Sequence, residues 1–219
     1  MTAAHCIVVA LQCRHAPYGQ LFSYSDVRGY DMAVRVADHK YTQRGRPAYN
    51  VRVQGIIMHP FFGGTSGGFD IALLKLGREV KRSSLTEYAC LPEPEFTLPV
   101  GYFCYLAGWG FIPNPPYAPL AVHSETLMEL RIPIISADLC KTRNLFIKEQ
   151  QDVCTHGAHG MACNCDSGGG LHCFTENGSK WVLYGVLYHG NPACYGGFNV
   201  FTLTAPNVDW IKRVMNANT

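Results

Sequence analysis

The sequence has few charged residues, little net charge and no long apolar run. Charged residues make up 16% of the 219 positions, and the formal net charge is +2. Without a strong field of one sign, recruitment of nucleic acid or of a membrane surface is not expected. No apolar run reaches the roughly 18 residues that a membrane-spanning helix needs. Apolar residues at 47% and aromatic residues at 12% argue against a disordered chain.

The start of the chain lacks the marks of an export signal. Residues 1–6 contain neither a basic segment nor a leading apolar segment, so they do not form a signal peptide. The chain nevertheless has ten cysteines, which is high for a cytosolic protein, whose thiols stay reduced. Two explanations are open at this point: a secreted domain held by disulfides, or cysteines that bind a metal.

Glycine and proline are frequent, with 22 and 13 residues, and this is typical of short strands joined by turns. Period-two alternation and short apolar runs predict strands at 30–41, 49–53, 70–76, 102–107, 127–134, 181–188 and 199–204. Helices are predicted near 136–141 and 206–215. The prolines of residues 91–101 indicate an extended connector. This order favours an all-β protein of two packed barrels with a terminal helix.

Three short segments carry residues that are used in nucleophilic catalysis. They are Thr2-Ala3-Ala4-His5-Cys6, Phe69-Asp70-Ile71-Ala72-Leu73-Leu74-Lys75-Leu76, and Cys163-Asn164-Cys165-Asp166-Ser167-Gly168-Gly169-Gly170-Leu171-His172-Cys173. Singly, each has an ordinary explanation: a buried histidine, a capping aspartate and a turn. Together, in the order His, Asp, Ser, they indicate a set for nucleophilic catalysis.

With these segments, the chain resembles the trypsin/chymotrypsin-like serine proteases, peptidase family S1. The resemblance runs from residue 2 almost to the C-terminus and includes Ala107-Gly108-Trp109-Gly110 and Asp209-Trp210-Ile211. In motif detail the chain is most similar to the pancreatic elastases, through Cys163-Asn164, Leu171-His172-Cys173 and Val200-Phe201-Thr202.

The resemblance implies an all-β fold of two packed, six-stranded, antiparallel barrels, the first of them incomplete, with a C-terminal helix. One peptidase domain would cover residues 1–216. Its expected parts are a first barrel at about 1–92, a connector at 93–101, a second barrel at about 102–205 and a terminal helix at about 206–216. Residues 7–29 would form a loop that is longer than usual and overhangs the active-site cleft.

The same resemblance assigns roles to the motif residues. Ser167 would be the nucleophile, His5 the general base and Asp70 the group that orients the imidazole. The backbone N–H groups of Cys165 and Ser167 would form the oxyanion hole. Asp166 would be the activation-pocket carboxylate, which binds a new α-amine in active family members and would here lack that ammonium partner.

The resemblance also describes the reaction and its partners. Peptide bonds of protein or peptide substrates would be hydrolysed through an acyl-enzyme, without cofactor or metal. Protease inhibitors are further expected partners, nucleic acid and membranes are not, and a monomer is expected. The substrate pocket would contain Met161, Tyr188, His189, Gly190 and Asn199. Because Met161 stands where trypsin-like enzymes carry an aspartate, an apolar residue rather than Lys or Arg is expected at the cleaved bond.

Six cysteines pair by resemblance, as Cys104–Cys173, Cys140–Cys154 and Cys163–Cys194. The partners of Cys6 and Cys90 would lie before Met1. This predicts that the chain is an N-terminally incomplete part of a secreted protease, with its export signal upstream. Cys13 and Cys165 have no implied partner, and a Cys6–Cys13 bridge is an alternative.

Three further readings of the sequence stay open. A metal site from Cys154, His156, His159, Cys163 and Cys165 is disfavoured, because two of these cysteines have disulfide partners by resemblance. Asn177-Gly178-Ser179 is an acceptor motif for N-glycosylation. Cys165 stands where the family has a glycine, in a backbone conformation that favours glycine, and a tolerated cysteine with reduced activity is the alternative. The alternative to a protease is therefore a catalytically impaired homologue that acts as a binding or regulatory module.

Overall fold

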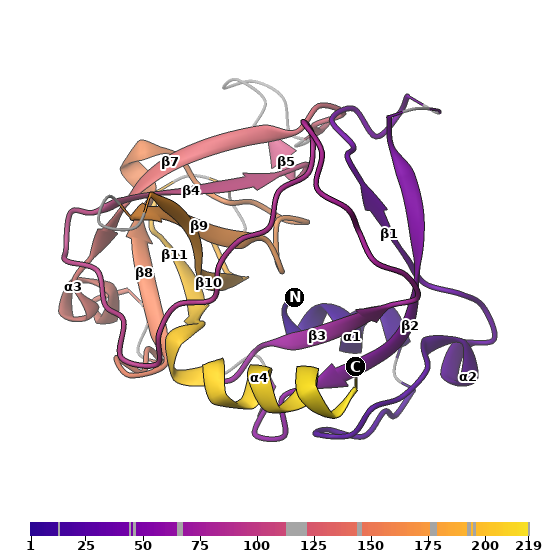
Figure 1. Ribbon diagram of the computed structural model, residues 1–219. Helices are drawn as coiled ribbons and strands as arrows, with labels where there is room; N and C mark the ends of the chain where they lie inside the picture. The colour runs from indigo at the N-terminus through magenta and orange to yellow at the C-terminus, as the bar shows by residue number, and fades with distance from the viewer. Residues whose placement is uncertain are drawn as a thin grey trace.

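The computed structural model describes residues 1–12, 14–43, 45, 47–64, 68–112, 122–143, 146–175, 179–191, 194 and 196–218. In Figure 1 the second half of the chain winds into a barrel of strands, and the first half forms an open sheet with helices beside it. The C-terminal helix extends from the barrel toward that sheet. No helix of the described residues has both the length and the apolar character needed to cross a membrane.

Six strands of the second half close into an antiparallel barrel. They are β4 (Phe103–Gly108), β7 (Met128–Ile135), β8 (Asp152–His156), β9 (Gly170–Thr175), β10 (Lys180–His189) and β11 (Phe198–Leu203). Their order around the barrel is β10-β11-β8-β7-β4-β9. Because side chains alternate along each strand, Leu106, Ile132, Leu171 and Phe201 reach the same buried core. Closure pairs both sides of each of these six strands.

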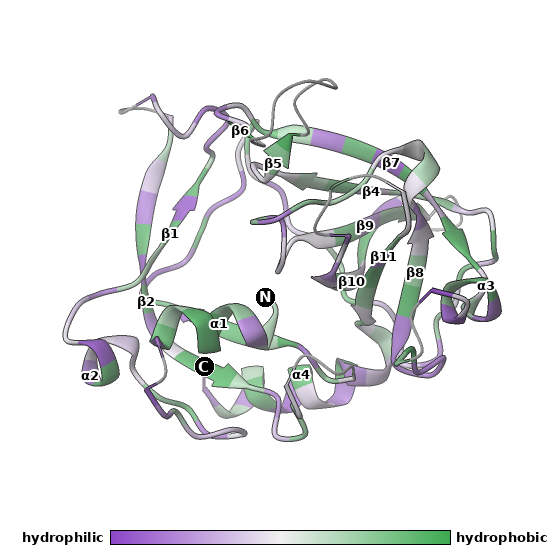
Figure 2. Cartoon of the chain, turned by 180° about the vertical axis from the view of Figure 1, so that it is seen from behind, coloured by the Kyte–Doolittle hydropathy of each residue, from purple (hydrophilic) through white to green (hydrophobic). Residues whose placement is uncertain are grey.

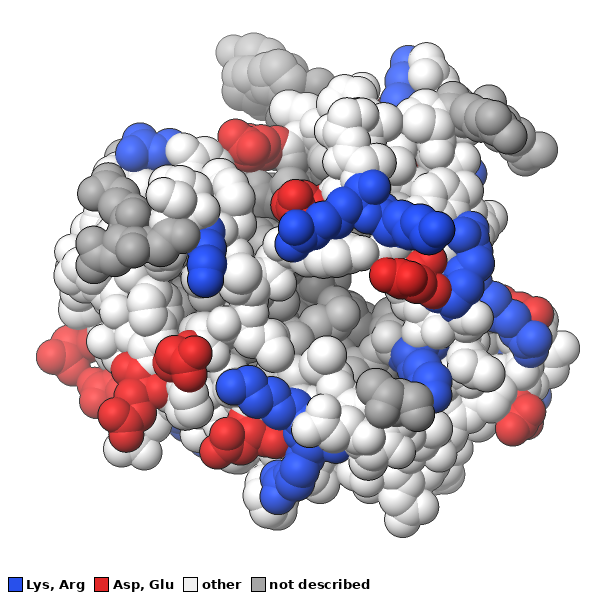
Figure 3. All heavy atoms as spheres, viewed as in Figure 1, with Lys and Arg blue, Asp and Glu red and all other residues white. Residues whose placement is uncertain are grey.

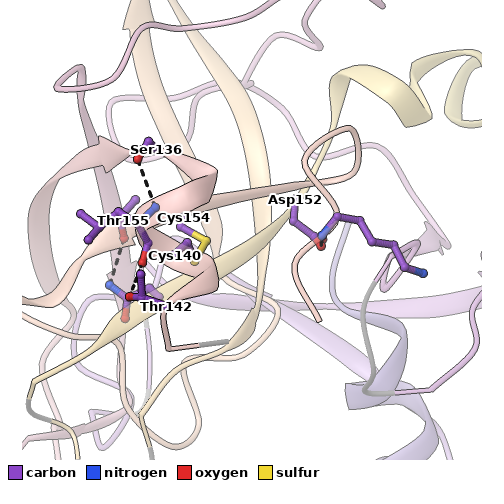
Figure 4. Close-up of a disulfide and its surroundings, with 9 residues drawn as sticks. Ser136, Cys140, Thr142, Asp152, Cys154 and Thr155 are labelled. Carbon is purple, nitrogen blue, oxygen red and sulfur yellow. Dashed lines mark hydrogen bonds between the residues drawn. A yellow bond between two sulfur atoms is a disulfide. The ribbon is translucent and has the colours of Figure 1, made fainter. Parts of the chain in front are cut away.

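The second half also holds short elements, which are β5 (Phe111–Ile112), β6 (Val122–His123), α3 (Ala137–Lys141), and the 3-10 helices η1 (Gly157–His159) and η3 (Ala205–Asn207). The helix predicted at 136–141 is confirmed as α3. It begins after Ser136, whose Oγ accepts a hydrogen bond from the backbone N of Leu139 at 3.2 Å. The Cys140–Cys154 disulfide joins α3 to β8 (Figure 4).

The first half contains a three-stranded antiparallel sheet in the order β1-β2-β3. Its strands are β1 (Ala33–Val36), β2 (Tyr49–Met58) and β3 (Ala72–Leu76). The alternation seen in the sequence is confirmed in β2, where Val51 and Val53 are buried and Arg52 between them is exposed. The strand expected at 30–41 is shorter, because Ala37 adopts a positive φ of 57° that ends the extended conformation.

The loop expected at residues 7–29 contains two helices, which the sequence did not indicate. They are α1 (Ala4–Leu11), which is mostly apolar in Figure 2, and α2 (Tyr24–Arg28). Ile7 and Leu11, one helical turn apart, enter a core with residues of β2. The hydroxyl of Tyr24 donates to the backbone O of Ala10 at 3.0 Å. Burial of this apolar face, rather than any capping signal, explains the helix.

The helix predicted at 206–215 is confirmed as α4 (Val208–Ala217), which follows η3. Trp210 and Ile211 are buried in a cluster with Ile57 and Ile71 of the first half and Val186 of β10. The helix therefore packs against both halves of the chain.

Charged side chains of both signs appear on the face shown in Figure 3, where Lys and Arg form a band with acidic residues beside it. Exposed ion pairs join Arg52 to Asp31 and Arg82 to Glu87, each at 2.8 Å. Such exposed pairs contribute little to stability, typically about 0–1 kcal/mol. The face in this view therefore carries both positive and negative side chains.

Candidate active site

His5 and Asp70 form a hydrogen-bonded pair in the first half of the chain. Nδ1 of His5 lies 2.7 Å from Oδ2 of Asp70, and the backbone N of His5 donates to Oδ1 at 2.9 Å. Asp70 is fully buried. A buried carboxylate that accepts from Nδ1 keeps the proton on that nitrogen and leaves the lone pair on Nε2. The pair is therefore built to present a base at Nε2.

The environment raises the pKa of the His5 imidazole to about 10. The main cause is the hydrogen bond to Asp70, and a contact with the Cys6 thiol adds to it. Partial burial of the ring acts in the opposite direction, because it disfavours the charged form. The imidazolium is thus stabilised by its neighbours more than it is penalised by burial.

A short backbone bridge brings His5 to Asp70. Thr2 and Ala72 exchange two backbone hydrogen bonds, of 2.9 and 2.7 Å, and form an antiparallel bridge at the start of β3. After Thr2 the chain enters α1, which contains His5, and before Ala72 it passes through Phe69 and Asp70. Phe69 has a φ of 60°, and its ring stacks on His59 at a centroid distance of 4.6 Å. Residues distant in sequence are placed side by side by this bridge.

Ser167 lies in the turn before β9, and its segment contacts the residues that precede His5. Gly168 N donates to Leu187 O at 2.8 Å, and Leu187 N donates to Gly169 O at 2.9 Å. A Cβ on Gly168 would approach Thr2 Oγ1 to 2.3 Å, so only a glycine fits there. Two backbone hydrogen bonds to β10 thus hold the serine turn against residue 2.

Within the described residues, no hydrogen bond joins Ser167 to His5. The atom in contact with His5 Nε2 is Sγ of Cys6, at 3.5 Å. Cys6 is a half-buried free cysteine that follows His5 in α1. The structure therefore brings His5 and Asp70 together directly and places the Ser167 turn against Thr2, with the Cys6 thiol in contact with His5 Nε2.

Asp166 accepts two backbone hydrogen bonds. Gly110 N donates to Oδ1 at 2.8 Å and Cys163 N donates to Oδ2 at 2.9 Å. A cavity of about 260 Å³ adjoins this carboxylate and includes Gly110 and Met161 in its lining. The carboxylate thus has two N–H donors in the described structure, which the sequence did not predict.

Cys165 is exposed and adopts a φ of 75°, in the left-handed region that favours glycine. Among the described residues, neither the backbone N of Cys165 nor that of Ser167 donates to another backbone or side-chain acceptor. Both N–H groups are left for solvent or a ligand. The cost of this backbone conformation for a residue with a side chain is about 1–2 kcal/mol.

A hollow of about 210 Å³ lies beside Ser167. Its lining residues are Ala162, Cys163, Asn164, Cys165, Ser167, Leu187, Tyr188, His189, Gly190 and Asn191. Three of the five residues expected in the substrate pocket, Tyr188, His189 and Gly190, belong to this lining. Met161 lines the cavity next to Asp166 instead. No acidic side chain is among the described residues that line the hollow, and burial lowers the pKa of His189.

Asn199 and Asp152 are buried residues that contact the lining of this hollow from behind. The buried Asn199 accepts from Ala162 N at 2.9 Å through Oδ1 and donates to Thr155 Oγ1 at 3.0 Å through Nδ2. It therefore holds residue 162 from behind instead of lining the hollow. Burial raises the pKa of Asp152 to about 6, and burial followed by the nearby Asp152 raises the pKa of the Tyr188 phenol. Asp152 could not be predicted as a buried residue, because an aspartate inside a strand is normally exposed.

The structure contains the three disulfides Cys104–Cys173, Cys140–Cys154 and Cys163–Cys194. Cys6, Cys90 and Cys165 are free cysteines of the described residues. Cys13 and Asn177, the possible bridge partner and the glycosylation acceptor, lie outside the described residues.

The alternative metal site loses ligands in this arrangement. Sulfur atoms of Cys154 and Cys163 are in disulfides, and Nδ1 of His156 accepts from Ala158 N at 2.9 Å. The part of the chain that the structure describes contains no group of three or more metal-binding side chains. The side chain of His159 is not described.

The family model of trypsin matches residues 1–211 of the chain. The chain belongs to the trypsin family. The prediction of a trypsin-like all-β fold is thereby confirmed, since the closed six-stranded barrel and the small C-terminal helix fit it.

The chain is also similar to chymotrypsins and to an elastase. The chain is 35% identical over 151 residues to chymotrypsin-C of Mus musculus, which covers 66% of this chain and 54% of that protein. It is 32% identical over 222 residues to chymotrypsin-C of Bos taurus, covering 97% and 73%. It is 29% identical over 227 residues to chymotrypsin-like elastase family member 1 of Homo sapiens, covering 100% and 78%. The chain thus spans about half the length of the mouse relative, and the match to elastase supports the elastase-like detail only weakly.

Proposed function

We propose that residues 1–216 form a serine endopeptidase domain that uses Ser167, His5 and Asp70. The observation that supports it most directly is the 2.7 Å contact of His5 Nδ1 with the buried Asp70 carboxylate. A serine hydroxyl is a poor nucleophile near neutral pH until a positioned base takes its proton. Protein or peptide substrates and extracellular action fit the named relatives and the three disulfides.

The proposed reaction proceeds through an acyl-enzyme. His5 Nε2 takes the proton of Ser167 Oγ as the oxygen attacks the substrate carbonyl, and Asp70 stabilises the resulting imidazolium. The proton then passes to the leaving amine. Water, activated by the same nitrogen, releases the acyl group from Ser167. For this cycle the Ser167 hydroxyl must take the place at Nε2 that the Cys6 thiol holds in the structure.

The backbone N–H groups of Cys165 and Ser167 are proposed to bind the oxyanion of the tetrahedral intermediate. Each such donor is worth about 3–4 kcal/mol in the transition state. Since Cys165 holds a left-handed backbone at residue 165, its donor would be harder to keep in place than that of a glycine.

An apolar residue is proposed at the acyl side of the cleaved bond. The hollow beside Ser167 has about 210 Å³, and its described lining includes Leu187 and Tyr188 and holds no carboxylate. Without a carboxylate, a Lys or Arg side chain would lose its hydration there with no compensating charge. A small or medium apolar side chain fits this space better.

A catalytically impaired homologue is the second candidate function. Two observations favour it, the positive φ of Cys165 and the occupation of His5 Nε2 by the Cys6 thiol. In this form the chain would keep the hollow for binding peptides without cleaving them.

A fluorophosphonate probe separates the two functions. The purified full chain is treated with the probe, and the labelled peptide is identified by mass spectrometry, with Ser167→Ala as the control. Labelling at Ser167 that disappears in the variant supports the protease. Absence of labelling in a chain whose three disulfides are verified favours the impaired homologue. A peptide mixture with Leu, Ala or Arg before the scissile bond then tests the pocket, and preference for Arg would contradict the apolar assignment.

A further inference from the structure

Asp70 lies at the centre of a tight turn. The backbone N of Ile71 donates to the backbone O of Phe69 at 2.8 Å, and a hydrogen bond between residues two apart is that of a γ-turn. Phe69, the first residue of this turn, has a φ of 60°. A bulky residue rarely adopts this left-handed conformation, which persists only where surrounding contacts hold it. The direction of the Asp70 carboxylate therefore depends on the contacts of residue 69.

His59 contacts both ends of this turn. Its backbone N donates to the backbone O of Ile71 at 3.0 Å. Its ring stacks on the ring of Phe69, with the centroids 4.6 Å apart and an angle of 11° between the planes. One residue, distant in sequence from Asp70, is thus hydrogen-bonded to one end of the turn and stacked on the other.

The ring of His59 is itself fixed by its neighbours. It is 4% exposed, and its Nδ1 accepts from the backbone N of Phe61 at 3.2 Å. The ring of Trp210, from α4, lies at a centroid distance of 4.5 Å and an angle of 61°. Burial, followed by the charge of Arg213, lowers the pKa of His59 to about 4, so the ring is uncharged at neutral pH. A neutral ring held in this way gives Phe69 a rigid surface to stack on.

Both hydrogen bonds between Asp70 and His5 depend on this turn. The carboxylate accepts from the backbone N of His5 at 2.9 Å and contacts Nδ1 at 2.7 Å. Hydrogen bonds of this kind weaken steeply with distance and angle, so a small backbone rotation at residue 69 would lengthen one or both of them. Such a rotation requires the ring of Phe69 to leave the ring of His59.

We propose that Phe69 and His59 are positioning residues for Asp70, because the stack of their rings holds the left-handed backbone of residue 69 and directs the carboxylate to His5. The position of the carboxylate can be measured whether or not the chain is catalytic. The consequence for catalysis rests on the proposed function, in which Asp70 keeps the His5 imidazole in the orientation that Ser167 needs.

Titration of His5 by NMR tests the positioning in the full chain. The histidine rings are labelled with nitrogen-15, and the His5 signals are assigned from their loss in His5→Gln. Phe69→Leu keeps an apolar side chain of similar size and removes the ring, and it should lower the His5 midpoint by about one pH unit or more, since a longer bond to Asp70 stabilises the imidazolium less. His59→Ala should act in the same direction. His59→Phe keeps a ring for stacking and should stay near the parent midpoint.

Two control variants separate positioning from stability. Phe61→Leu is the same substitution in the same aromatic group, but Phe61 is 71% exposed and its hydrogen bond to His59 comes from the backbone, so the His5 midpoint should not change. Ile132→Val removes a methylene group from the core of the barrel and should reduce stability without moving the midpoint. A purely structural role of Phe69 would make Phe69→Leu behave like Ile132→Val.

Two results would overturn the proposal. One is a Phe69→Leu chain with unchanged circular dichroism that keeps the parent midpoint of His5. The other is a shift in Ile132→Val as large as that in Phe69→Leu, because the midpoint would then follow general stability. Phe69→Leu decides the question even where His59→Ala does not fold.

Fluorophosphonate labelling of Ser167 gives the catalytic readout. Phe69→Leu should slow labelling about tenfold, because a small displacement of the group that orients the base is costly, and Phe61→Leu should keep the parent rate. If Ser167 is unlabelled in the parent while Phe69→Leu shifts the His5 midpoint, the proposed protease function fails and the positioning stands. If Ser167 labels at the parent rate in Phe69→Leu and the midpoint is unchanged, the positioning fails and the protease function stands.

Discussion

His5 binds Asp70 twice, through its backbone N at 2.9 Å and through Nδ1 at 2.7 Å. The two carboxylate oxygens are thereby used by one residue, which fixes both the position of the helix start and the tautomer of the ring. This double contact links the protonation of His5 to the conformation of residues 2–5, so pH should report on both activity and stability.

The first prediction concerns the pH dependence of catalysis. Because the pKa of His5 is raised to about 10, its base form increases only in alkaline solution, and kcat/KM should rise with a midpoint well above pH 6.5. Cys6→Ala should lower the midpoint moderately. Asp70→Asn should lower it more strongly and reduce kcat by about 10³–10⁴-fold. A midpoint near 6.5 in the unmodified chain would contradict this reasoning.

The same shift affects stability with a defined sign. The folded pKa of His5 lies above its unfolded value, so the stabilisation is fully present below pH 6.5 and is lost as pH rises toward about 10. Urea unfolding between pH 6 and 10 should show this decline in the parent chain and a weaker one in Asp70→Asn.

The second prediction concerns the positive φ of Cys165. Cys165→Gly should stabilise the chain by about 1 kcal/mol and increase kcat severalfold, because the backbone conformation becomes unstrained. Cys165→Ala is the matched control, since it removes the thiol and keeps the Cβ. If Ala improves kcat as much as Gly, the thiol rather than the backbone limits activity.

The third prediction concerns Asp152, whose pKa burial raises to about 6. A carboxyl group with a folded pKa above its unfolded value of 3.8 binds more protons in the folded state. Its contribution to stability therefore falls as pH rises from about 4 to 6. Asp152→Asn should be more stable than the parent at pH 7 and show a flatter profile, measured by chemical unfolding. A less stable Asn variant at pH 7 would show that the ionised carboxylate is needed.

The fourth prediction compares the two halves by hydrogen exchange. Strands of the closed barrel are paired on both sides, whereas β1 and β3 each pair with a single named strand of the described residues. Edge strands expose backbone groups to water, so amides of β1 and β3 should exchange at least tenfold faster than those of β10 and β11. Equal protection in both halves would contradict an open sheet.

Much of this architecture could be predicted from the sequence, because a strand with one buried face shows alternating apolar and polar residues. Val51 and Val53 indicated β2 in this way, and Pro206 with the apolar face of α4 indicated the final helix. Helix α1 could not be predicted, because its apolar residues lie around the His5 motif and no capping side chain marks its start. Its stability comes from contacts with distant β2 residues, which local patterns do not contain.

The candidate site was predictable in its residue types and less so in its contacts. The order of His5, Asp70 and Ser167 and their flanking residues carried the family resemblance. The contact between Cys6 Sγ and His5 Nε2 depends on side-chain directions at the start of α1, and one of the two donors to Asp166, Gly110 N, comes from another loop. Neither contact can be derived from sequence spacing. The same holds for the hydrogen bond by which Asn199 holds Ala162 in the wall of the hollow.

The cluster around α4 has a consequence for how the chain would lose activity. Trp210 and Ile211 pack with Ile71, the neighbour of Asp70, and with Val186 of the barrel strand that holds the serine turn. The positions of the proposed nucleophile and base relative to each other therefore depend on the apolar contacts of this cluster. Moderate heating, or removal of the last residues of α4, would separate the two halves and abolish activity while the barrel stays folded. Loss of activity and unfolding of the barrel would then occur at different temperatures.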